Sequence, residues 1–481
     1  MELVRGASRL FTCSFVRPVI VYGAPVKAIN LVKASDRPVL FRNIVTAHQI
    51  LSNKPKENNL SKAKFPGLKM SQLENPRFKS LFTPELNYLV KLFEENGYQL
   101  RIAGGAVRDL LLGKFPNDVD FATTATPTEM KALFGKHEIR MINNKGESHG
   151  TITCRINDKE NFEVTTLRID VVTDGRHAEV EFTKDWQLDA LRRDLTINSM
   201  FLGFDGTVYD YFNGQEDLAK RRVCFVGNAT DRIREDYLRI LRYFRFYGRI
   251  AEDANVHESE TLNSIRQNAK GLGGISGERI WLELKKIATG NHGAHLFEVM
   301  VELGLAPFLG LPSKMNIEEL HVVSQRSKGL EPHHMTLIAA ALHNEEEVNK
   351  FNDRMKMSKD EFRTGVFIIH HREDNPPEED MLRYCQDLMC DTVGKEPRTK
   401  DKVMELLKYW GKKDTLEAFK NWNLPKFPVN GHSLLEKGVP KGPALAKMLS
   451  ALRGKWKESA YEATEEELLT FVDELKETIL K

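Results

Sequence analysis

The chain has 481 residues, of which 41% are hydrophobic and 29% charged. This composition is ordinary for a soluble globular protein and excludes a collagen-like, disulfide-scaffold or mostly disordered chain. No run of about 18 apolar residues occurs, so no transmembrane helix and no membrane partner are predicted. The net charge is +2, but the first 69 residues hold twelve Lys or Arg against three Asp or Glu. Any nucleic-acid partner must therefore be held by a local basic stripe rather than by global charge.

Residues 1–69 are predicted to be a mitochondrial transit peptide followed by a linker. In the first twenty residues, apolar side chains approximate one helical face, Arg5 and Arg9 lie on another, and Pro18 ends the pattern. A secretory signal and a disordered tail are the alternatives. Met70 stands where folded sequence begins and could serve as a second start, giving a cytosolic or nuclear form. The five scattered cysteines, without a CxxC, indicate reduced thiols.

The next part of the chain predicts a small α+β domain. An amphipathic helix over 78–96 ends at Gly97, and a strand, a glycine turn and a helix follow over 99–113. Residues 117–124 predict a strand, Pro127 opens another helix, and 150–156 with 161–169 predict a hairpin. Residues 170–186 show weak periodicity, strand signals fade after 187, and almost everything from 230 onward predicts helix.

The strongest local feature is a Gly104-Gly105 turn followed by Asp118 and Asp120. Glycines between a strand and a helix allow backbone N–H groups to approach a phosphate closely. If Asp118 and Asp120 lie in one strand, their side chains share a face and offer oxygen ligands suited to Mg²⁺. These parts suit phosphoryl or nucleotidyl transfer by metal ions. A solvent-exposed strand with no catalytic role is the alternative.

Two further charged motifs follow. Asp189, Arg192, Arg193 and Asp194 are either a helix turn with internal ion pairs or arginines that bind ribose and triphosphate. In the helix after Glu235, the arginines at 239, 242, 245 and 249 recur at helical spacing and need anions to satisfy them if buried. Asp236 and Arg239, one turn apart, offer an acceptor and a donor fork that could bind a nucleobase edge. An internal ion pair is the alternative.

The order of these motifs resembles the class II tRNA nucleotidyltransferases, the CCA-adding enzymes. The motifs are GGAVRD at 104–109, DxD at 118–120, RRD at 192–194, Asp210 to Gly214, and EDxxR at 235–239. Residues 427–452 also resemble the family's C-terminal region, and with the presequence the whole resembles the animal mitochondrial and cytosolic form. The resemblance implies a polymerase-β-like head followed by a helical neck, body and tail. The expected boundaries are 1–69 for the presequence, 70–205 for the head, 206–290 for the neck and 291–481 for the body and tail.

The resemblance also implies a reaction and its participants. The enzyme would add C, C and A to the 3′ end of tRNA without a nucleic-acid template, from CTP and ATP, with release of pyrophosphate. Asp118 and Asp120 would hold two Mg²⁺ ions, and Glu163 is the candidate third carboxylate. Asp236 and Arg239 would select the base, and residues 170–187 would be the flexible loop that permits the switch from C to A. The expected nucleotide-binding residues are Gly104, Gly105, Arg108, Arg192, Arg193, Asp194, Asp236, Arg239, Arg242 and Arg245.

Some alternatives remain open. A poly(A) polymerase of the same superfamily shares several motifs, and a non-catalytic tRNA-binding protein would differ only in chemistry. The chain is expected to be a monomer or weak homodimer. The glycine-rich segment 271–279 lacks the Lys-Ser/Thr of a P-loop and predicts a turn between helices capped by Ser276. The His pairs at 333–334 and 370–371 are interpreted as core or helix-surface histidines, because no His-Asp dipeptide occurs.

Overall fold

The structure is a computed structural model that describes residues 67–142, 144–173, 178–392 and 397–479. The predicted transit peptide lies outside the described residues except for its last three positions, and residues 174–177 of the expected flexible loop also lie outside them. No helix in the described ranges is long and apolar enough to cross a membrane.

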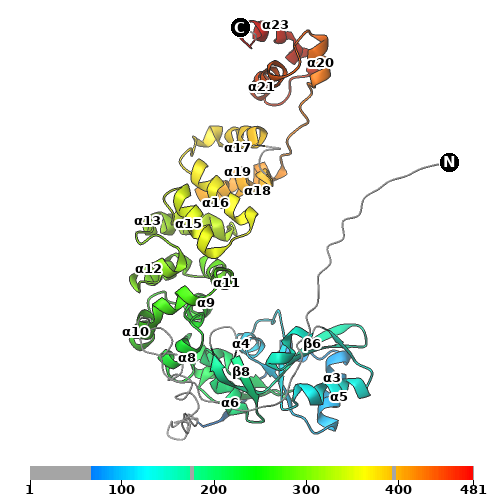
Figure 1. Cartoon of the computed structure of the whole chain (residues 1–481), viewed down its shortest axis with the longest axis vertical. Coiled ribbons are helices and arrows are strands. Elements are labelled where there is room, and N and C mark those ends of the chain that lie inside the picture. Colours follow the sequence, from blue (N-terminus) through cyan, green and yellow to red (C-terminus); the bar gives the residue numbers. More distant parts are fainter. Residues whose placement is uncertain (1–66, 143, 174–177, 393–396, 480–481) are drawn as a thin grey trace, which may run out of the picture. The chain divides into compact units, whose positions relative to one another are not determined.

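Eight strands of the described head form one mixed sheet in the order β1-β10-β9-β2-β3-β6-β5-β4 (Figure 1). They are β1 (Lys69–Gln72), β2 (Leu100–Ala103), β3 (Asp120–Thr123), β4 (Arg140–Ile142), β5 (Thr151–Ile156), β6 (Glu160–Thr166), β9 (Phe201–Leu202) and β10 (Thr207–Asp210). Neighbours are antiparallel except β3 and β6, which run parallel with Asp120 opposite Glu163. The predicted hairpin is confirmed as β5 and β6, whose buried and exposed residues alternate as a half-buried sheet requires.

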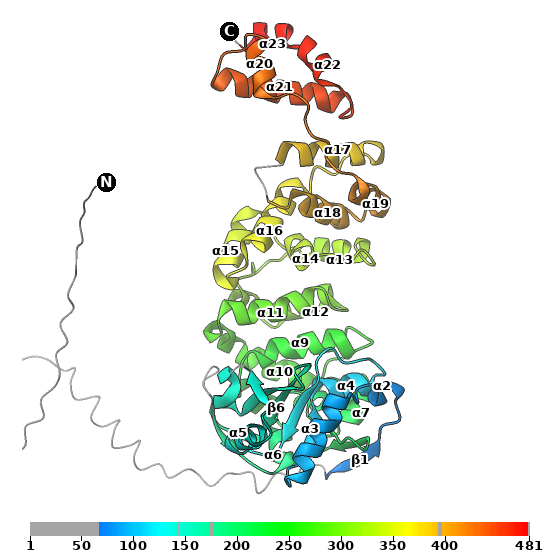
Figure 2. The same cartoon turned by 90° about the vertical axis from the view of Figure 1, so that its right-hand side faces the viewer.

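Short helices pack around this sheet (Figure 2). They are α2 (Pro76–Lys79), α3 (Pro84–Glu95), α4 (Gly105–Leu111), α5 (Pro127–Lys136), α6 (Trp186–Leu191) and α7 (Gly214–Ala219), with 3-10 turns at η2 (Asn144–His149) and η3 (Thr196–Asn198). The single helix expected over 78–96 is two helices. The Thr83 side chain accepts a hydrogen bond from Leu86 N and Pro84 takes the first helical position, so α3 starts afresh there.

Three expectations about strands are wrong. Residues 168–182 contain a two-stranded antiparallel ribbon, β7 (Arg168–Thr173) and β8 (Ala178–Phe182), rather than an irregular loop throughout. Strands continue after residue 187, because β9 pairs with both β2 and β10. β1 starts at Lys69, the last residue of the expected linker, and pairs at the edge of the sheet with β10, so the sheet includes residues on both sides of the expected 70–205 head. β1, β9 and β10 have only two to four residues, too few to show a period of two.

The chain from α8 onward is helical in its described residues, as predicted. The helices are α8 (Ala229–Glu235), α9 (Arg239–Ile250), α10 (Ser259–Asn268), α11 (Gly277–Ala288), α12 (Gly293–Glu302), α13 (Ile317–Arg326), α14 (His334–Ala340), α15 (Glu345–Met355), α16 (Lys359–His371), α17 (Glu378–Thr392), α18 (Thr399–Trp410), α19 (Lys413–Asn421), α20 (Gly431–Glu436), α21 (Pro443–Glu458), α22 (Glu465–Thr470) and α23 (Val472–Ile479), with 3-10 turns η4 (Ala269–Gly274) and η5 (Ala306–Leu309). The α+β class is therefore confirmed.

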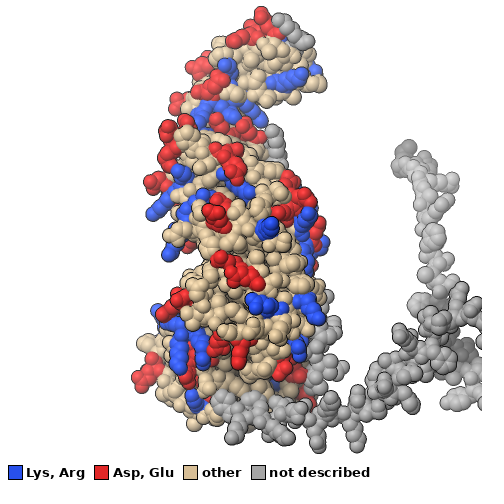
Figure 3. All heavy atoms as spheres, turned by 90° about the vertical axis from the view of Figure 1, so that its left-hand side faces the viewer, with Lys and Arg blue, Asp and Glu red and all other residues tan. Residues whose placement is uncertain are grey.

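The apolar interior continues from the head sheet into the helices that follow it. One core joins α3 and β2 to α9, α11 and the helices up to Phe419, while the last helices have a core of their own around Leu434, Leu452 and Trp456. On the face shown in Figure 3, basic and acidic side chains are interspersed over the helices rather than gathered into one large patch of a single sign. Helix α9 is thus anchored in the same core as the sheet that carries Asp120.

Candidate active site

A polar cavity of about 1170 Å³ opens where the head sheet meets α8, α9 and α11. Every residue predicted for the metal and nucleotide sites lines it: Gly104, Gly105, Arg108, Asp118, Asp120, Glu163, Arg192, Arg193, Asp194, Asp236, Arg239, Arg242 and Arg245. These residues come from segments up to about 140 positions apart in the chain. The structure therefore brings the sequence motifs together in one place.

The glycine turn approaches a charged side chain closely. Gly104 has φ +65°, and a Cβ added there would lie 2.9 Å from Nη1 of Arg193. Gly105 begins α4 directly after it. Both the backbone conformation and the neighbouring guanidinium therefore require glycine at position 104.

The two aspartates lie at the start of the adjacent strand. Asp120 is the first residue of β3, whereas Asp118 lies in the loop before it, so the expectation that both sit within one strand is wrong. Burial raises the pKa of Asp120; the charge of Arg193 opposes this rise and the Asp118 carboxylate adds to it. The repulsion shows that Asp118 and Asp120 are close enough to sense each other.

Glu163 on β6 lies opposite Asp120 on β3, because these two strands run parallel and pair in this register. The structure does not assemble a three-carboxylate group, because no cluster of three His, Cys, Asp or Glu suited to a metal exists within the described ranges. Glu163 therefore remains a candidate by its place in the register alone.

Asp189 organises the two arginines of the RRD motif. Its side chain is 1% exposed; Oδ1 accepts from Arg192 Nε at 2.8 Å, and Oδ2 accepts from Arg193 Nη2 at 3.0 Å. Arg193 also donates through Nη1 to the Asn198 carbonyl oxygen. The internal ion pairs expected as one interpretation of this motif are confirmed. Both arginines also line the cavity.

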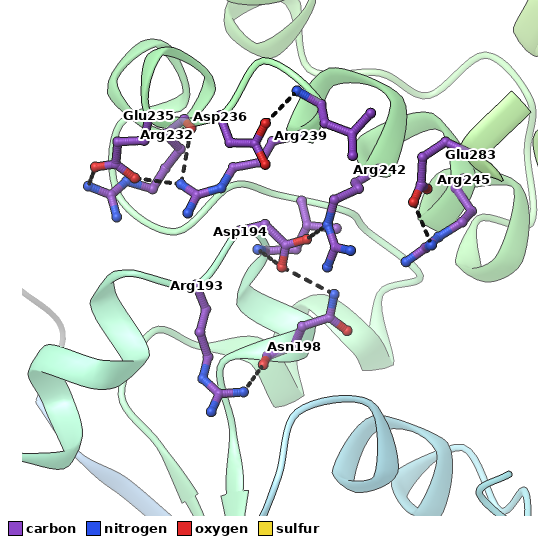
Figure 4. A network of polar contacts seen from close by, with 12 residues as sticks. Arg193, Asp194, Asn198, Arg232, Glu235, Asp236, Arg239, Arg242, Arg245 and Glu283 are labelled. Carbon is purple, nitrogen blue, oxygen red and sulfur yellow. Dashed lines mark hydrogen bonds and ion pairs between the residues drawn. The ribbon is translucent and has the colours of Figure 1, made fainter. Parts of the chain in front are cut away.

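Asp194 ties the head to α9 (Figure 4). Its Oδ2 accepts from Arg242 Nε at 2.6 Å and its Oδ1 accepts from Leu195 N at 2.8 Å. Burial alone would raise the pKa of Asp194, but the Arg242 charge and hydrogen bond lower it. Asp194, which lines the cavity, is thus kept ionised.

The other arginines of the site also have internal carboxylate partners. Arg245 donates to Glu283 at 3.0 Å, and Arg249 donates to Asp109 at 2.8 Å. Arg108 is 4% exposed and bonds to Asp109 and to Asn198, and burial lowers its pKa. The expectation that the α9 arginines need anions is confirmed, and the anions are carboxylates of the protein, as the internal ion-pair alternative supposed. Sequence reasoning missed Glu283 and Asp109 as their partners because the pairs join separate helices.

The side chains of Asp236 and Arg239 do not pair with each other; only the backbone N–H of Arg239 donates to the Asp236 carbonyl oxygen, at 2.9 Å. Arg239 bonds to Glu235, one turn back, and donates to the carbonyl oxygens of Arg232 and Arg192. Asp236 accepts from Arg279 Nη2 at 2.9 Å. Figure 4 shows both side chains beside Arg242 at the cavity, so the acceptor and the donor fork remain neighbours with separate supports.

The motif from Asp210 to Gly214 is structural. The Asp210 carboxylate accepts from the backbone N–H groups of Phe212, Gly214 and Gln215, which starts α7. A Cβ on Gly214 would lie 2.3 Å from the Thr196 carbonyl oxygen, so only glycine fits. This motif supports the turn that carries Asp194 and Asn198 rather than the ligand.

Comparisons with known proteins identify the family of this chain. A family model described as the poly A polymerase head domain matches residues 100–224, and one described as a probable RNA and SrmB-binding site of polymerase A matches 258–312. The protein named CCA tRNA nucleotidyltransferase 1, mitochondrial, of Danio rerio is 55% identical over 402 residues, which cover 83% of this chain and 93% of that one. This chain belongs to the CCA tRNA nucleotidyltransferase family.

Other members of the CCA tRNA nucleotidyltransferase family support the same conclusion. The protein of the same name from Homo sapiens is 53% identical over 404 residues, covering 83% of this chain and 92% of that one. The crystal structure of the Bacillus stearothermophilus CCA-adding enzyme in complex with CTP has a TM-score of 0.68 at 25% identity, covering 84% of this chain and 99% of that one. The resemblance inferred from the five motifs is confirmed.

Proposed function

We propose that this chain adds C, C and A in turn to the 3′ end of tRNA, from CTP and ATP. The observation that carries the proposal is the 55% identity over almost the full length of a named CCA tRNA nucleotidyltransferase, together with one cavity lined by every residue predicted for the metal and nucleotide sites. The RNA 3′ hydroxyl oxygen attacks the α-phosphorus of the nucleotide. The bond from that phosphorus to the bridging oxygen breaks, the hydroxyl proton is lost, and pyrophosphate leaves.

Asp118 and Asp120 are the residues that fit a divalent metal. They provide two carboxylates at one edge of the cavity, and the repulsion between them is the kind that a cation relieves. Bound Mg²⁺, as two ions, would lower the pKa of the attacking hydroxyl and neutralise charge on the leaving oxygens. Glu163, opposite Asp120, is the further carboxylate we assign to this edge.

The triphosphate is assigned to the glycine turn and the RRD motif. The turn at Gly104 leads directly into α4, whose first backbone N–H groups have no partner within the helix, and Arg193 lies against the turn. Asp189 holds Arg192 and Arg193 in place, so their guanidinium groups are oriented before a nucleotide arrives. This preorganisation lowers the conformational entropy that binding must cost.

Asp236 and Arg239 are assigned the choice of base. An ionised carboxylate only accepts hydrogen bonds and a guanidinium only donates them. Cytosine and adenine both offer an amine donor next to a ring acceptor, whereas uracil offers the opposite polarity. Arg239 donates three hydrogen bonds within the protein, and a guanidinium has five N–H donors, so donors remain for a base. Arg242 and Arg245, held by Asp194 and Glu283, support this pair.

The proposal is tested by supplying each nucleoside triphosphate singly to the purified chain with a tRNA that lacks its CCA end. CTP alone should extend the tRNA by two residues. ATP alone should extend only a tRNA that already ends in CC, and by one residue. Long adenylate tails from ATP alone would indicate a poly(A) polymerase instead, and absence of any extension, with tRNA still bound, would indicate a non-catalytic tRNA-binding protein.

We further propose a mitochondrial location, because both relatives from Danio rerio and Homo sapiens are named mitochondrial. A chain that starts at Met70 is proposed as the form without the mitochondrial transit peptide. Such a chain keeps three of the four β1 residues that pair with β10. We place the end of the head after β10 rather than at 205, because that strand completes the sheet.

A further inference from the structure

The glycine-rich segment 271–279 has no role in the chemistry described so far, yet it contacts both Asp236, which is assigned to base choice, and the next residue, Tyr237. It forms the 3-10 turn η4 and the first turn of α11. Ser276 takes the position before α11, but its side chain makes no capping hydrogen bond, so the expected serine cap is wrong. Other contacts therefore determine where this segment lies.

The first contact is steric. Gly271 lies directly under the ring of Tyr237, since a Cβ added at Gly271 would be 2.0 Å from Cδ1 and 2.2 Å from Cε1 of that ring. Tyr237 is the residue after Asp236 and packs against the main core. Any side chain at position 271 would displace the ring, and the backbone of Asp236 would move with it.

The second contact is ionic. Arg279 Nη2 donates to Asp236 Oδ2 at 2.9 Å, while Asp236 Oδ1 accepts from the backbone N–H of Leu238 at 3.1 Å. Each carboxylate oxygen is thus fixed by one donor and keeps a second lone pair for another. Arg279 and the backbone N–H of Leu238 together set the direction of the remaining lone pairs.

The turn itself is rigidly held from behind. Arg354 on α15 donates through Nη2 to the carbonyl oxygens of Leu272 and Ile275, at 3.0 and 2.9 Å. A Cβ on Gly277 would lie 1.9 Å from the Arg354 carbonyl oxygen, so α11 begins in close contact with α15. One helical turn further along α11, Glu283 accepts from Arg245 of α9. These contacts hold the segment in one position against α15 and, through α11, against α9.

We propose that the segment 271–279 is a positioning element for base choice, in which Gly271 seats Tyr237 and Arg279 orients the Asp236 carboxylate. The inference rests on the proposed role of Asp236. A site rejects a base of wrong polarity only if its acceptor cannot turn away from the mismatch. Without Arg279, the carboxylate keeps only the hydrogen bond from Leu238 N, so its orientation is held by one donor instead of two and uracil is then rejected less strongly.

The test compares kcat/KM for CTP, ATP and UTP in the full chain. Arg279→Ala should lower the preference for CTP over UTP by about tenfold, the worth of one hydrogen bond to a charged group. Arg279→Lys should restore part of that preference, because it returns a cation without the planar fork. Inhibition by pyrophosphate should stay unchanged, which a general loss of structure would not allow.

Glycine variants of the same turn supply a matched pair. Gly271→Ala should relax base choice as Arg279→Ala does, whereas Gly274→Ala should not, because a Cβ at Gly274 meets nothing within 4 Å. If Gly271→Ala does not fold, the Arg279 variants alone decide the question.

The possible failures are distinguishable. If Asp236→Ala reduces the preference for CTP but Arg279→Ala keeps it within about twofold of the unmodified chain, the positioning role is refuted and the base assignment stands. Tighter CTP binding in Arg279→Ala would also refute it, because Arg279 would then be a competitor for Asp236. If Asp236→Ala itself leaves the preference unchanged, the assignment of base choice fails, and this inference fails with it.

Discussion

The carboxylate of Asp189 should be essential to both the stability and the activity of the head. It is 1% exposed and accepts four hydrogen bonds. Oδ1 accepts from Arg168 N and Arg192 Nε, and Oδ2 accepts from Arg193 Nε and Nη2. In Asp189→Ala, two guanidinium groups that are less than one-fifth exposed lose their counter-charge. Removal of one partner from a buried ion pair costs about 3 to 5 kcal/mol of folding stability. Because water in the cavity can solvate the unpaired guanidinium groups, we expect a loss of about 3 kcal/mol.

Asp189→Asn separates charge from shape. The amide oxygen can replace Oδ1 and keep the bonds to Arg168 and Arg192, but the amide NH₂ then meets the donors of Arg193. Only Arg193 is released, at a cost of about 2 kcal/mol. Because Arg193 lies against Gly104, kcat/KM for CTP and ATP should fall alike, by about tenfold.

The measurement is urea unfolding of each variant beside kinetics with CTP and ATP. Glu216→Gln is the control, because it makes the same change of carboxylate to amide in an exposed pair with Lys220 and should alter neither quantity measurably. The reasoning is refuted if Asp189→Ala unfolds at the same urea concentration as Glu216→Gln.

The other predictions concern the metal-binding aspartates, the transit peptide and the dependence of stability on pH. Asp118→Ala should unfold like the unmodified chain, since it removes a repulsion with Asp120, and should add neither C nor A; retained addition of C would contradict the metal assignment. A reporter fused to residues 1–45 should enter mitochondria and a chain starting at Met70 should not, as judged by fractionation; cytosolic retention of the fusion would contradict the transit peptide. Burial, with His333 beside it, lowers the pKa of His334 from 6.5 to about 4. The unfolded chain therefore binds this proton first, and about 2 kcal/mol of stability should be lost between pH 7 and pH 5. That loss should shrink in His334→Gln, and an equal loss in both chains would contradict it.

The sequence predicted which residues form the site because the chemistry of each motif is local. A GG turn, a DxD and an EDxxR can be recognised by residue type and spacing, and all of them line the same cavity. The helical part was equally predictable, since amphipathic periods run over ten or more residues in helices such as α9 and α16. Each of these signals lies within one segment of the chain.

The partners of those residues could not be predicted, because they lie far away in the chain. Arg245 is paired with Glu283, 38 positions later, and Arg249 with Asp109, 140 positions earlier. Arg239 was expected beside Asp236 on spacing alone, but Glu235 is nearer along the helix face and Asp236 turns to Arg279. The strands β1, β9 and β10 were missed for the same reason, since two to four residues carry no period and only their long-range pairing makes them strands.

The central claim is that this chain builds the sequence CCA and then stops. The most direct measurement supplies a tRNA without its CCA end together with all four nucleoside triphosphates at equal concentration, and sequences the 3′ ends of the products. The account predicts ends of C, CC and CCA, with CCA dominant at long times and neither U nor G among the added residues. Frequent incorporation of U, or extension of CCA by further A residues, would contradict it.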